Sequence, residues 1–146
     1  MASTHDYIAD KRNKDILIYI NGKFFHRSDA KVSVFDSGFL LGDGVWEGIR
    51  LHKNSLIHFD QHINRLYAGA DAIAMKIQLN KNELKDAVML TLEKNAMHSD
   101  THIRLIVSRG IKSTPYQHPK VTIGDPTIVI IPEYKKPNSE VFDIGI

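Results

Sequence analysis

Two histidines are spaced as a metal site would require. His58 and His62 lie four residues apart, the separation that places two zinc ligands on one face of a helix. However, His58 falls in an expected strand, no glutamate follows it in an H-E-x-x-H pattern, and no third ligand is evident. We therefore predict no metal site.

The glycine-rich stretch "FLLGDGVWEGIR" raises the question of phosphate binding. A dinucleotide-binding fingerprint, G-x-G-x-x-G, would need a third glycine where Glu47 stands, and a helix where a strand is expected. The Gly-Lys-Ser or Gly-Lys-Thr of a P-loop is also missing from the sequence. We interpret Gly42 and Gly44 as parts of a turn, whose backbone can approach another group closely.

Two arginines are placed where they could bind an anion. Arg65 lies early in an expected helix, beside its apolar stripe, and a guanidinium can bind an anion through two parallel hydrogen bonds. Arg104 lies in a strand whose Ile103 and Leu105 point the other way, so Arg104 shares its face with His102. Residue chemistry alone leaves a surface role open for both arginines, and for Arg65 it favours a surface salt bridge.

Hairpins and a turn are expected ahead of the first helix. Asn21-Gly22 divides the β-rich stretch 15–27, and Asn-Gly favours the positive backbone angles of a two-residue turn. A second hairpin is expected between residues 45–51 and 55–59. Residues 31–36 alternate apolar and polar side chains and are predicted to form a short strand, followed by a turn region with room for one helical turn.

Two amphipathic helices are expected next. Asp60 is the predicted N-cap of the first helix, whose apolar side chains recur at helical spacing from Ile63 to Ile77. Asn80 is the predicted N-cap of the second, with an apolar stripe over residues 84–97.

Two strong strands complete the pattern, over residues 102–110 and 126–134. They are joined by a loop, residues 111–125, which is longer than a hairpin needs and is therefore a candidate functional loop. The sequence predicts an α+β fold, an antiparallel sheet with two main helices packed on one side.

The composition bounds the class of protein. The chain has 146 residues, 42% hydrophobic and 25% charged, with a net charge of +2, which suits one soluble globular domain without a nucleic-acid-binding stripe. It has no cysteine, no secretory signal and no apolar run of membrane-spanning length, so we expect a cytoplasmic protein without a membrane partner. We expect a tail over residues 1–15, a folded domain over 16–135, and a linker over 136–146 towards further sequence.

The order of the motifs carries a family resemblance. "INGKFF", "DSGFLLGDGVWEGIR", "FDQHINRLYAGADAI" and "IRLIVSRG" follow one another as in the N-terminal small domain of class IV (fold type IV) pyridoxal-phosphate aminotransferases, which the chain resembles over residues 16–135. That family includes branched-chain amino acid aminotransferases, D-amino acid aminotransferases and aminodeoxychorismate lyases.

The resemblance assigns the cofactor, pyridoxal 5′-phosphate (PLP), and its contacts. The arginine of the H-I-x-R-L block, which binds the cofactor phosphate in the family, corresponds to Arg65. The lysine that forms a Schiff base with the cofactor lies in the second domain of the family. We therefore expect it beyond residue 146, and expect this chain alone to be catalytically inactive.

The substrate pocket is also implied by the resemblance. Trp46 stands where relatives have an aromatic residue that lines the substrate side of the cofactor, and Leu41 and His102 stand where branched-chain relatives have tyrosine. Arg104 matches an arginine near the substrate carboxylate. Tyr116 stands where D-amino acid relatives have the histidine of an R-x-H motif, and this difference argues against the D-amino acid subfamily. The sequence "WEGIR" favours the branched-chain subfamily.

The implied activity is transfer of an amino group between an amino acid and a 2-oxo acid by a homodimeric enzyme. Two alternatives remain open. One is an aminodeoxychorismate lyase, in which the same cofactor serves a β-elimination. The other is a non-catalytic fragment or interaction domain.

Overall fold

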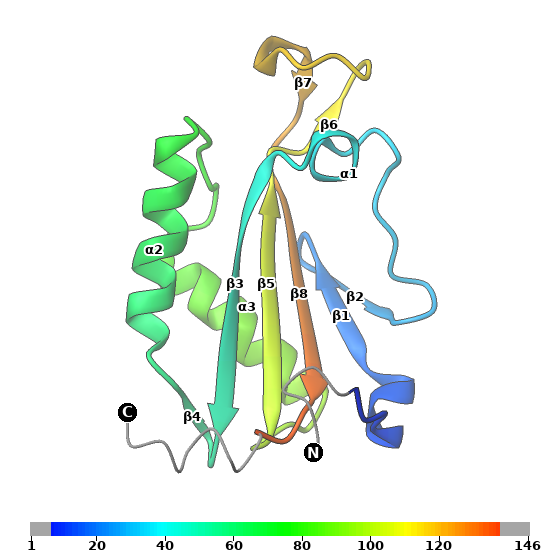
Figure 1. Ribbon diagram of the computed structural model, residues 1–146, viewed down its shortest axis with the longest axis vertical. Coiled ribbons are helices and arrows are strands. Elements are labelled where there is room, and N and C mark those ends of the chain that lie inside the picture. The colour runs from blue at the N-terminus through cyan, green and yellow to red at the C-terminus, as the bar shows by residue number, and fades with distance from the viewer. Residues whose placement is uncertain (1–6, 138–146) are drawn as a thin grey trace.

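A six-stranded antiparallel sheet is the frame of the structure, a computed structural model that describes residues 7–137 (Figure 1). Its strands are β1 (Leu17–Ile20), β2 (Lys23–His26), β3 (Gly44–His52), β4 (Ser55–Leu56), β5 (Thr101–Ser108) and β8 (Thr127–Tyr134). Across the sheet their order is β2-β1-β8-β5-β3-β4, and every neighbouring pair is antiparallel.

The remaining elements are two long helices and several short ones. A small hairpin projects from one end of the sheet (Figure 1). Its two strands pair with each other, and Ile111 also forms an isolated bridge to Asp36. The elements are η1 (Lys11–Asp15), α1 (Ser37–Leu41), α2 (Phe59–Ala72), α3 (Lys81–Lys94), β6 (Ile111–Lys112), η2 (Pro119–Val121) and β7 (Thr122–Ile123).

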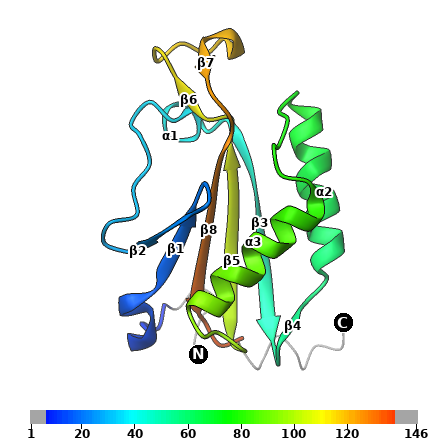
Figure 2. The ribbon, with the colours of Figure 1, turned by 180° about the vertical axis from the view of Figure 1, so that it is seen from behind.

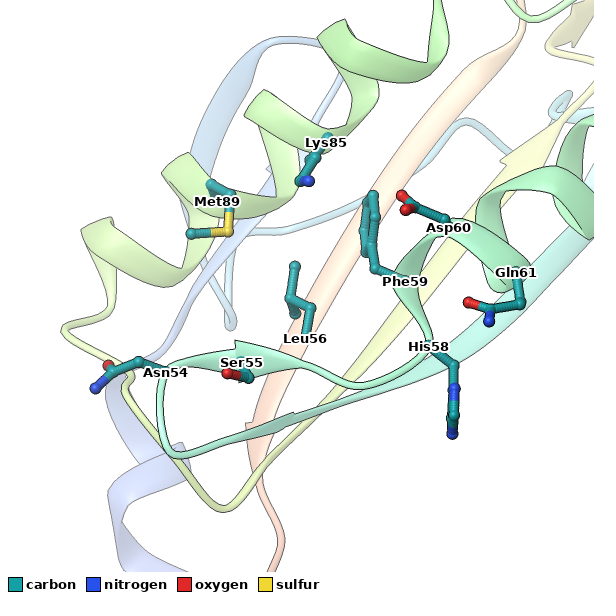
Figure 3. A pocket seen from close by; sticks show the side chains of 9 residues that line it. All are labelled: Asn54, Ser55, Leu56, His58, Phe59, Asp60, Gln61, Lys85 and Met89. Atoms are coloured by element: carbon teal, nitrogen blue, oxygen red, sulfur yellow. The ribbon is translucent and has the colours of Figure 1, made fainter.

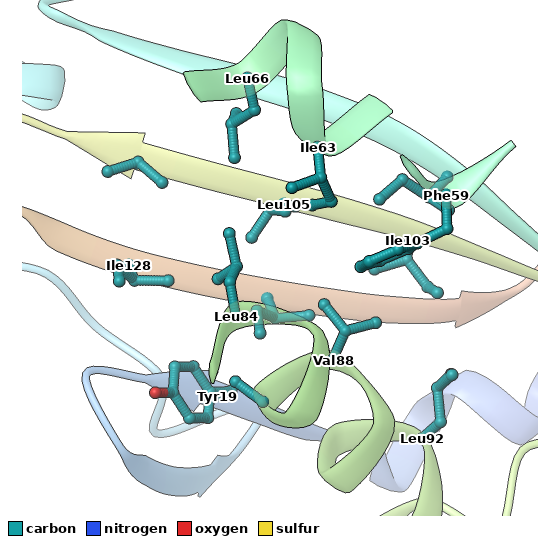
Figure 4. Close-up of a cluster of buried hydrophobic side chains, with 14 of the residues drawn as sticks. Tyr19, Phe59, Ile63, Leu66, Leu84, Val88, Leu92, Ile103, Leu105 and Ile128 are labelled. Carbon is teal, nitrogen blue, oxygen red and sulfur yellow. The ribbon is translucent and has the colours of Figure 1, made fainter. Parts of the chain in front are cut away.

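Helices α2 and α3 cover one face of the sheet and leave the other open (Figure 2). In the central strands, alternate side chains such as Ile49, Ile103, Leu105 and Ile130 point towards the helices and are fully buried. They pack against the apolar stripes of the helices, including Leu66, to form one continuous core (Figure 4). The predicted α+β fold, with both main helices on one side, is confirmed.

The predicted Asn21-Gly22 turn and the predicted Asn80 N-cap are both confirmed. Asn21 and Gly22 have φ angles of 47° and 86°, as a tight two-residue hairpin requires, and they connect β1 to β2. At the start of α3, the Asn80 side chain accepts from the Glu83 N–H, and the Glu83 carboxylate accepts from the Asn80 N–H. This reciprocal capping box fixes the first turn of the helix.

The short strand predicted over residues 31–36 is wrong. The segment lies outside the strands, and its only ladder contact is an isolated bridge from Asp36 to Ile111. An alternating pattern makes a strand only where a neighbouring strand is available. Here the chain leaves β2, which is the outermost strand of the sheet, and crosses to α1 without a partner (Figure 1).

The bounds of α2 also differ from the prediction. The helix begins at Phe59, with His58 at the N-cap position in a left-handed conformation, so Asp60 lies in the first turn and not at the cap. Its charge there still favours the positive end of the helix. The helix ends at Ala72, because left-handed Ala74 turns the chain, and the Met75 N–H donates to the Ala70 carbonyl.

The two ends of the described chain meet beside the sheet. The predicted tail over residues 1–15 includes η1, but η1 is hydrogen-bonded to β8. The Asn13 side chain accepts from the Tyr134 N–H at 2.7 Å and donates to the Tyr134 carbonyl at 3.0 Å. The predicted tail residues 1–6 and linker residues 138–146 lie outside the described residues. Among residues 7–137, no helix is both long and apolar enough to cross a membrane.

The capping box gives a test of the fold. Asn80→Ala removes the acceptor of the Glu83 N–H and should lower the free energy of unfolding by about 1 kcal/mol, measured by urea denaturation. The matched control is Asn82→Ala, an exposed residue two positions further along the same helix. Equal effects of the two substitutions would contradict the assigned cap.

Candidate active site

The open face of the sheet gathers the cationic and aromatic residues singled out in the sequence. β3 and β5 are paired so that Trp46 lies opposite Ile106, Gly48 opposite Arg104, and Arg50 opposite His102. Directly paired residues of an antiparallel sheet share a face. The side chains of Trp46, Arg50, His102 and Arg104 therefore all emerge on the side away from the helices.

Arg50 belongs to this group, although sequence reasoning did not single it out. The signal was available, because side chains alternate along a strand and Arg50 follows Trp46 by four positions. Its Nη1 donates to the Lys135 carbonyl at 2.8 Å, which holds the guanidinium beside the end of the sheet.

The Arg104 guanidinium lies over the Trp46 indole, with its central carbon 4.3 Å from the ring centroid. Such a cation–π contact orients the guanidinium but uses none of its N–H donors. Arg104 is exposed and makes no hydrogen bond to any residue of the described range 7–137. The pair therefore presents an oriented cation with free donors, which suits a carboxylate.

His102 lies across the backbone of β3 at Gly48. A Cβ placed on Gly48 would come within 2.9 Å of the His102 Nε2, so the ring occupies space that only a glycine leaves. His102 is half-buried. Burial, together with the charges of Arg50, Lys135 and Arg104, lowers the pKa of His102 below its ordinary value.

Arg65 lies on the other side of β3, on helix α2, and binds Glu47. Arg65 Nε and Nη2 donate to the two Glu47 carboxylate oxygens at 2.6 and 2.7 Å, and the His62 Nδ1 lies 2.8 Å from Oε2. The Glu47 side chain is only 4% exposed, whereas that of Arg65 is 73% exposed. The hydrogen bond from Arg65 lowers the pKa of Glu47 against the opposing effect of burial.

This arrangement decides between two interpretations of Arg65. The salt bridge favoured by residue chemistry is present, but its partner is a buried carboxylate of the sheet and not a surface group. The bidentate contact fixes the guanidinium plane, while Nη1 makes no hydrogen bond to residues 7–137. Arg65 is thus held in one orientation with part of its donor set directed away from Glu47.

The Gly-Asp-Gly stretch forms the predicted turn, a corner between α1 and β3. Gly42 ends α1 in the left-handed conformation, at φ 66°, and a Cβ on Gly44 would come within 2.6 Å of the Val107 carbonyl. Between them, the Asp43 carboxylate binds Arg109 Nε and Nη2 at 2.6 and 3.1 Å.

Arg109 ties this corner to the end of helix α2. Its remaining N–H donors bind the carbonyls of Ile73 and Ala74 at 2.7 and 3.1 Å, where the helix has unpaired acceptors. The guanidinium is largely buried, and Arg109 is therefore a structural residue that links β5, the corner and the helix that carries Arg65.

Leu41 and Tyr116 come from elements at one end of the sheet. Leu41 is the last residue of α1, and Tyr116 lies between β6 and η2, at the end of the molecule where the small hairpin projects (Figure 1). Both side chains are exposed. Within the described residues, no cation–π contact joins either side chain to Trp46 or Arg104.

The two histidines considered as metal ligands serve different contacts. His62 binds Glu47, whereas His58 lines a surface hollow of about 560 Å³ between β4, α2 and α3 (Figure 3). In this hollow the Lys85 ammonium lies 5.5 Å from the centre of the Phe59 ring, on the helix side of the sheet. It is separate from the open-face group.

Guanidinium groups held in one orientation on a sheet face and on an adjacent helix are suited to donate hydrogen bonds to a carboxylate or phosphate. Comparison with known proteins identifies the family of the chain. The family model of amino-transferase class IV matches residues 44–141, and the chain belongs to that family.

Named relatives agree with this assignment. The chain is 46% identical over 114 residues to a putative branched-chain-amino-acid aminotransferase of Methanocaldococcus jannaschii, which covers 78% of this chain and 38% of that protein. It is 31% identical over 124 residues to the aminodeoxychorismate lyase of Bacillus subtilis, covering 84% of this chain and 42% of that protein.

A solved structure shares the fold. The branched-chain aminotransferase of the thermophilic archaeon Thermoproteus uzoniensis, solved with norvaline, superimposes with a TM-score of 0.69 at 25% identity. The match covers 82% of this chain and 40% of that one. The chain thus spans about two fifths of the length of these relatives.

The Glu47 contacts generate a stability prediction. Glu47→Gln should lower the free energy of unfolding near neutral pH by about 1–2 kcal/mol, because the amide has one acceptor oxygen where the carboxylate has two, so one of the two Arg65 donors loses its acceptor. The cost stays modest because the Arg65 side chain is solvent-screened. Because the folded-state pKa of Glu47 lies below its ordinary 4.5, this contribution is complete above that pH and is lost as the pH falls through the folded-state value.

The measurement is urea denaturation of both proteins at several pH values. Glu93→Gln, an exposed residue whose carboxylate has no ion pair in the described part of the chain, is the control. A wild-type-like stability of Glu47→Gln at neutral pH would show that the buried carboxylate contributes nothing.

Proposed function

We propose that the chain is the small domain of a PLP-dependent aminotransferase, branched-chain-like, which moves an amino group between an amino acid and a 2-oxo acid. The observation that carries this proposal is the 46% identity to a putative branched-chain-amino-acid aminotransferase across most of the chain. Because the chain covers 38% of that relative, the proposed activity belongs to the complete protein.

The residues of this chain fit the phosphate of PLP. Arg65 is held by Glu47 with its side chain 73% exposed and with Nη1 available, so it can donate to a phosphate oxygen without being released from the carboxylate. When bound, PLP supplies the reversible attachment of the amino group and the electron sink that the transfer needs. In this proposal Arg65 binds and orients the cofactor, and Glu47 and His62 are positioning residues that hold Arg65.

The open face fits the substrate. Arg104 and Arg50 provide cations for a carboxylate, while the Trp46 indole and the neighbouring Ile106 provide an apolar wall. An amino acid with an apolar side chain needs both features, because its carboxylate and its side chain must be recognised separately. His102 lies between the two arginines and completes this pocket wall.

A homodimer is part of the proposal. Exposed apolar side chains gather on α1 and the β6–β7 hairpin, which lie together at one end of the molecule, and on the segment that leads from β2 up to α1 (Figure 1). A second copy that covers this surface would also give Leu41 and Tyr116 a pocket to line, since both side chains are exposed. The residues are Val32, Val34, Phe35, Phe39, Leu41, Ile111, Tyr116 and Ile123.

The B. subtilis relative supports one alternative, an aminodeoxychorismate lyase, in which the same domain would serve a β-elimination. Assays of the complete protein with PLP separate the two. An aminotransferase converts L-leucine and a 2-oxo acid to the exchanged pair and needs both substrates. A lyase consumes aminodeoxychorismate with no oxo acid present. Failure of the protein to act on either substrate set would leave the non-catalytic interpretation.

Arg65→Ala tests the cofactor assignment. Loss of one charge-assisted contact should weaken PLP binding to the complete protein by about 1.5–3 kcal/mol, which is roughly 10- to 150-fold in Kd. The Kd is measured by titration with PLP, with absorbance as the signal. Lys76→Ala removes an exposed positive charge beyond the end of the same helix and serves as the control. An unchanged Kd for Arg65→Ala in a folded protein would remove Arg65 from the phosphate role.

A further inference from the structure

His102 lies in a concentration of positive charge. Arg50 is its direct partner across the β3–β5 pair, Arg104 follows two positions along the same strand and therefore on the same face, and Lys135 lies beyond the end of β8. All three charges act on the His102 ring. They come from both neighbouring strands as well as from β5 itself.

The acidic groups nearby are otherwise engaged. Glu133 of β8 is directly opposite His102, but its carboxylate pairs with Arg27 Nη2 at 3.7 Å. Asp100, just before β5, acts on Arg50. Within residues 7–137, no carboxylate forms a hydrogen bond or ion pair with His102 or Arg104. The open face therefore has an excess of positive charge that a bound anion would neutralise.

The position of the ring makes it part of the pocket wall. Because Gly48 has no side chain, the imidazole lies across β3 in contact with its backbone, between the two arginines. Burial and the surrounding cations keep the pKa of His102 low, so the imidazole is neutral in the free protein near neutral pH.

We propose that His102 takes up a proton from solvent when a carboxylate binds beside Arg50 and Arg104, so that this face binds carboxylates more tightly as the pH falls. The inference rests on the proposed function, in which the carboxylate is that of an amino acid or 2-oxo acid. It adds a proton-linked anion contact that a tyrosine in the same position would not provide.

The physical basis is a reversal of the local potential. A carboxylate among the arginines supplies a negative charge that favours the imidazolium, and the imidazolium then donates a charge-assisted hydrogen bond. The pKa of His102 is thus higher in the complex than in the free protein. Carboxylate affinity is greatest below the pKa that His102 has in the free protein. Between that pKa and the higher pKa of the complex, the affinity falls by up to about tenfold per pH unit, and above the pKa of the complex it levels off.

The test is isothermal titration calorimetry of glutarate binding to the complete protein with PLP bound. Glutarate carries no group that can enter the reaction, and both its carboxylates are ionised between pH 6 and 8. Titrations in buffers of different ionisation enthalpy count the protons taken up. We expect each glutarate that binds to be accompanied by the uptake of up to one proton, and we expect the Kd for glutarate to rise with pH. His102→Gln should abolish both effects while retaining a weaker, pH-independent affinity.

Two further measurements keep the result decisive. His98→Gln alters an exposed histidine next to Asn54, away from the open face, and should leave the proton count unchanged. If His102→Gln does not fold, His102→Asn takes its place, since only a variant without the imidazole separates His102 from other groups that a carboxylate could protonate. Zero uptake, or equal uptake in wild type and His102→Gln, overturns the inference. An active aminotransferase whose glutarate binding is independent of pH overturns this inference alone, whereas absence of both transfer activity and glutarate binding overturns the proposed function as well.

Discussion

The register between β3 and β5 is the constraint on which the rest of the structure depends. Eight consecutive pairs, from Gly44 with Ser108 to Leu51 with Thr101, set which side chains face the helices and which face outward. A shift by one residue would turn Ile103 and Leu105 to solvent and bring Arg104 into the core. The hydrophobic core and the cationic face are therefore specified by the same set of backbone hydrogen bonds.

Because adjacent residues of β3 point to opposite sides, one strand serves two kinds of site. Trp46 contributes to the open face, whereas Glu47, the next residue, reaches the helix side and holds Arg65. The negative charge is buried and paired, and the exposed cations are left to bind anions. The corner at Asp43, held by Arg109, fixes where this strand begins relative to the end of α2.

Sequence patterns predicted those features that depend on neighbours along the chain. The Asn21-Gly22 turn, the Asn80 cap and the sharing of a face by His102 and Arg104 follow from local geometry. The partner of Arg65 could not be found in this way, because Glu47 lies on a strand that meets the helix only in the folded protein. The strand expected over residues 31–36 failed for the same reason, since strand formation needs a partner that sequence alternation does not supply.

The outer side of β3 has a further consequence. Among the described residues, β4 pairs only with Leu51 and His52, so the stretch from Gly44 to Ile49 has no strand partner on that side. Main-chain donors and acceptors there are unchanged by any non-proline substitution. An extended segment of backbone that lay along this edge could pair with these groups whichever side chains β3 carries.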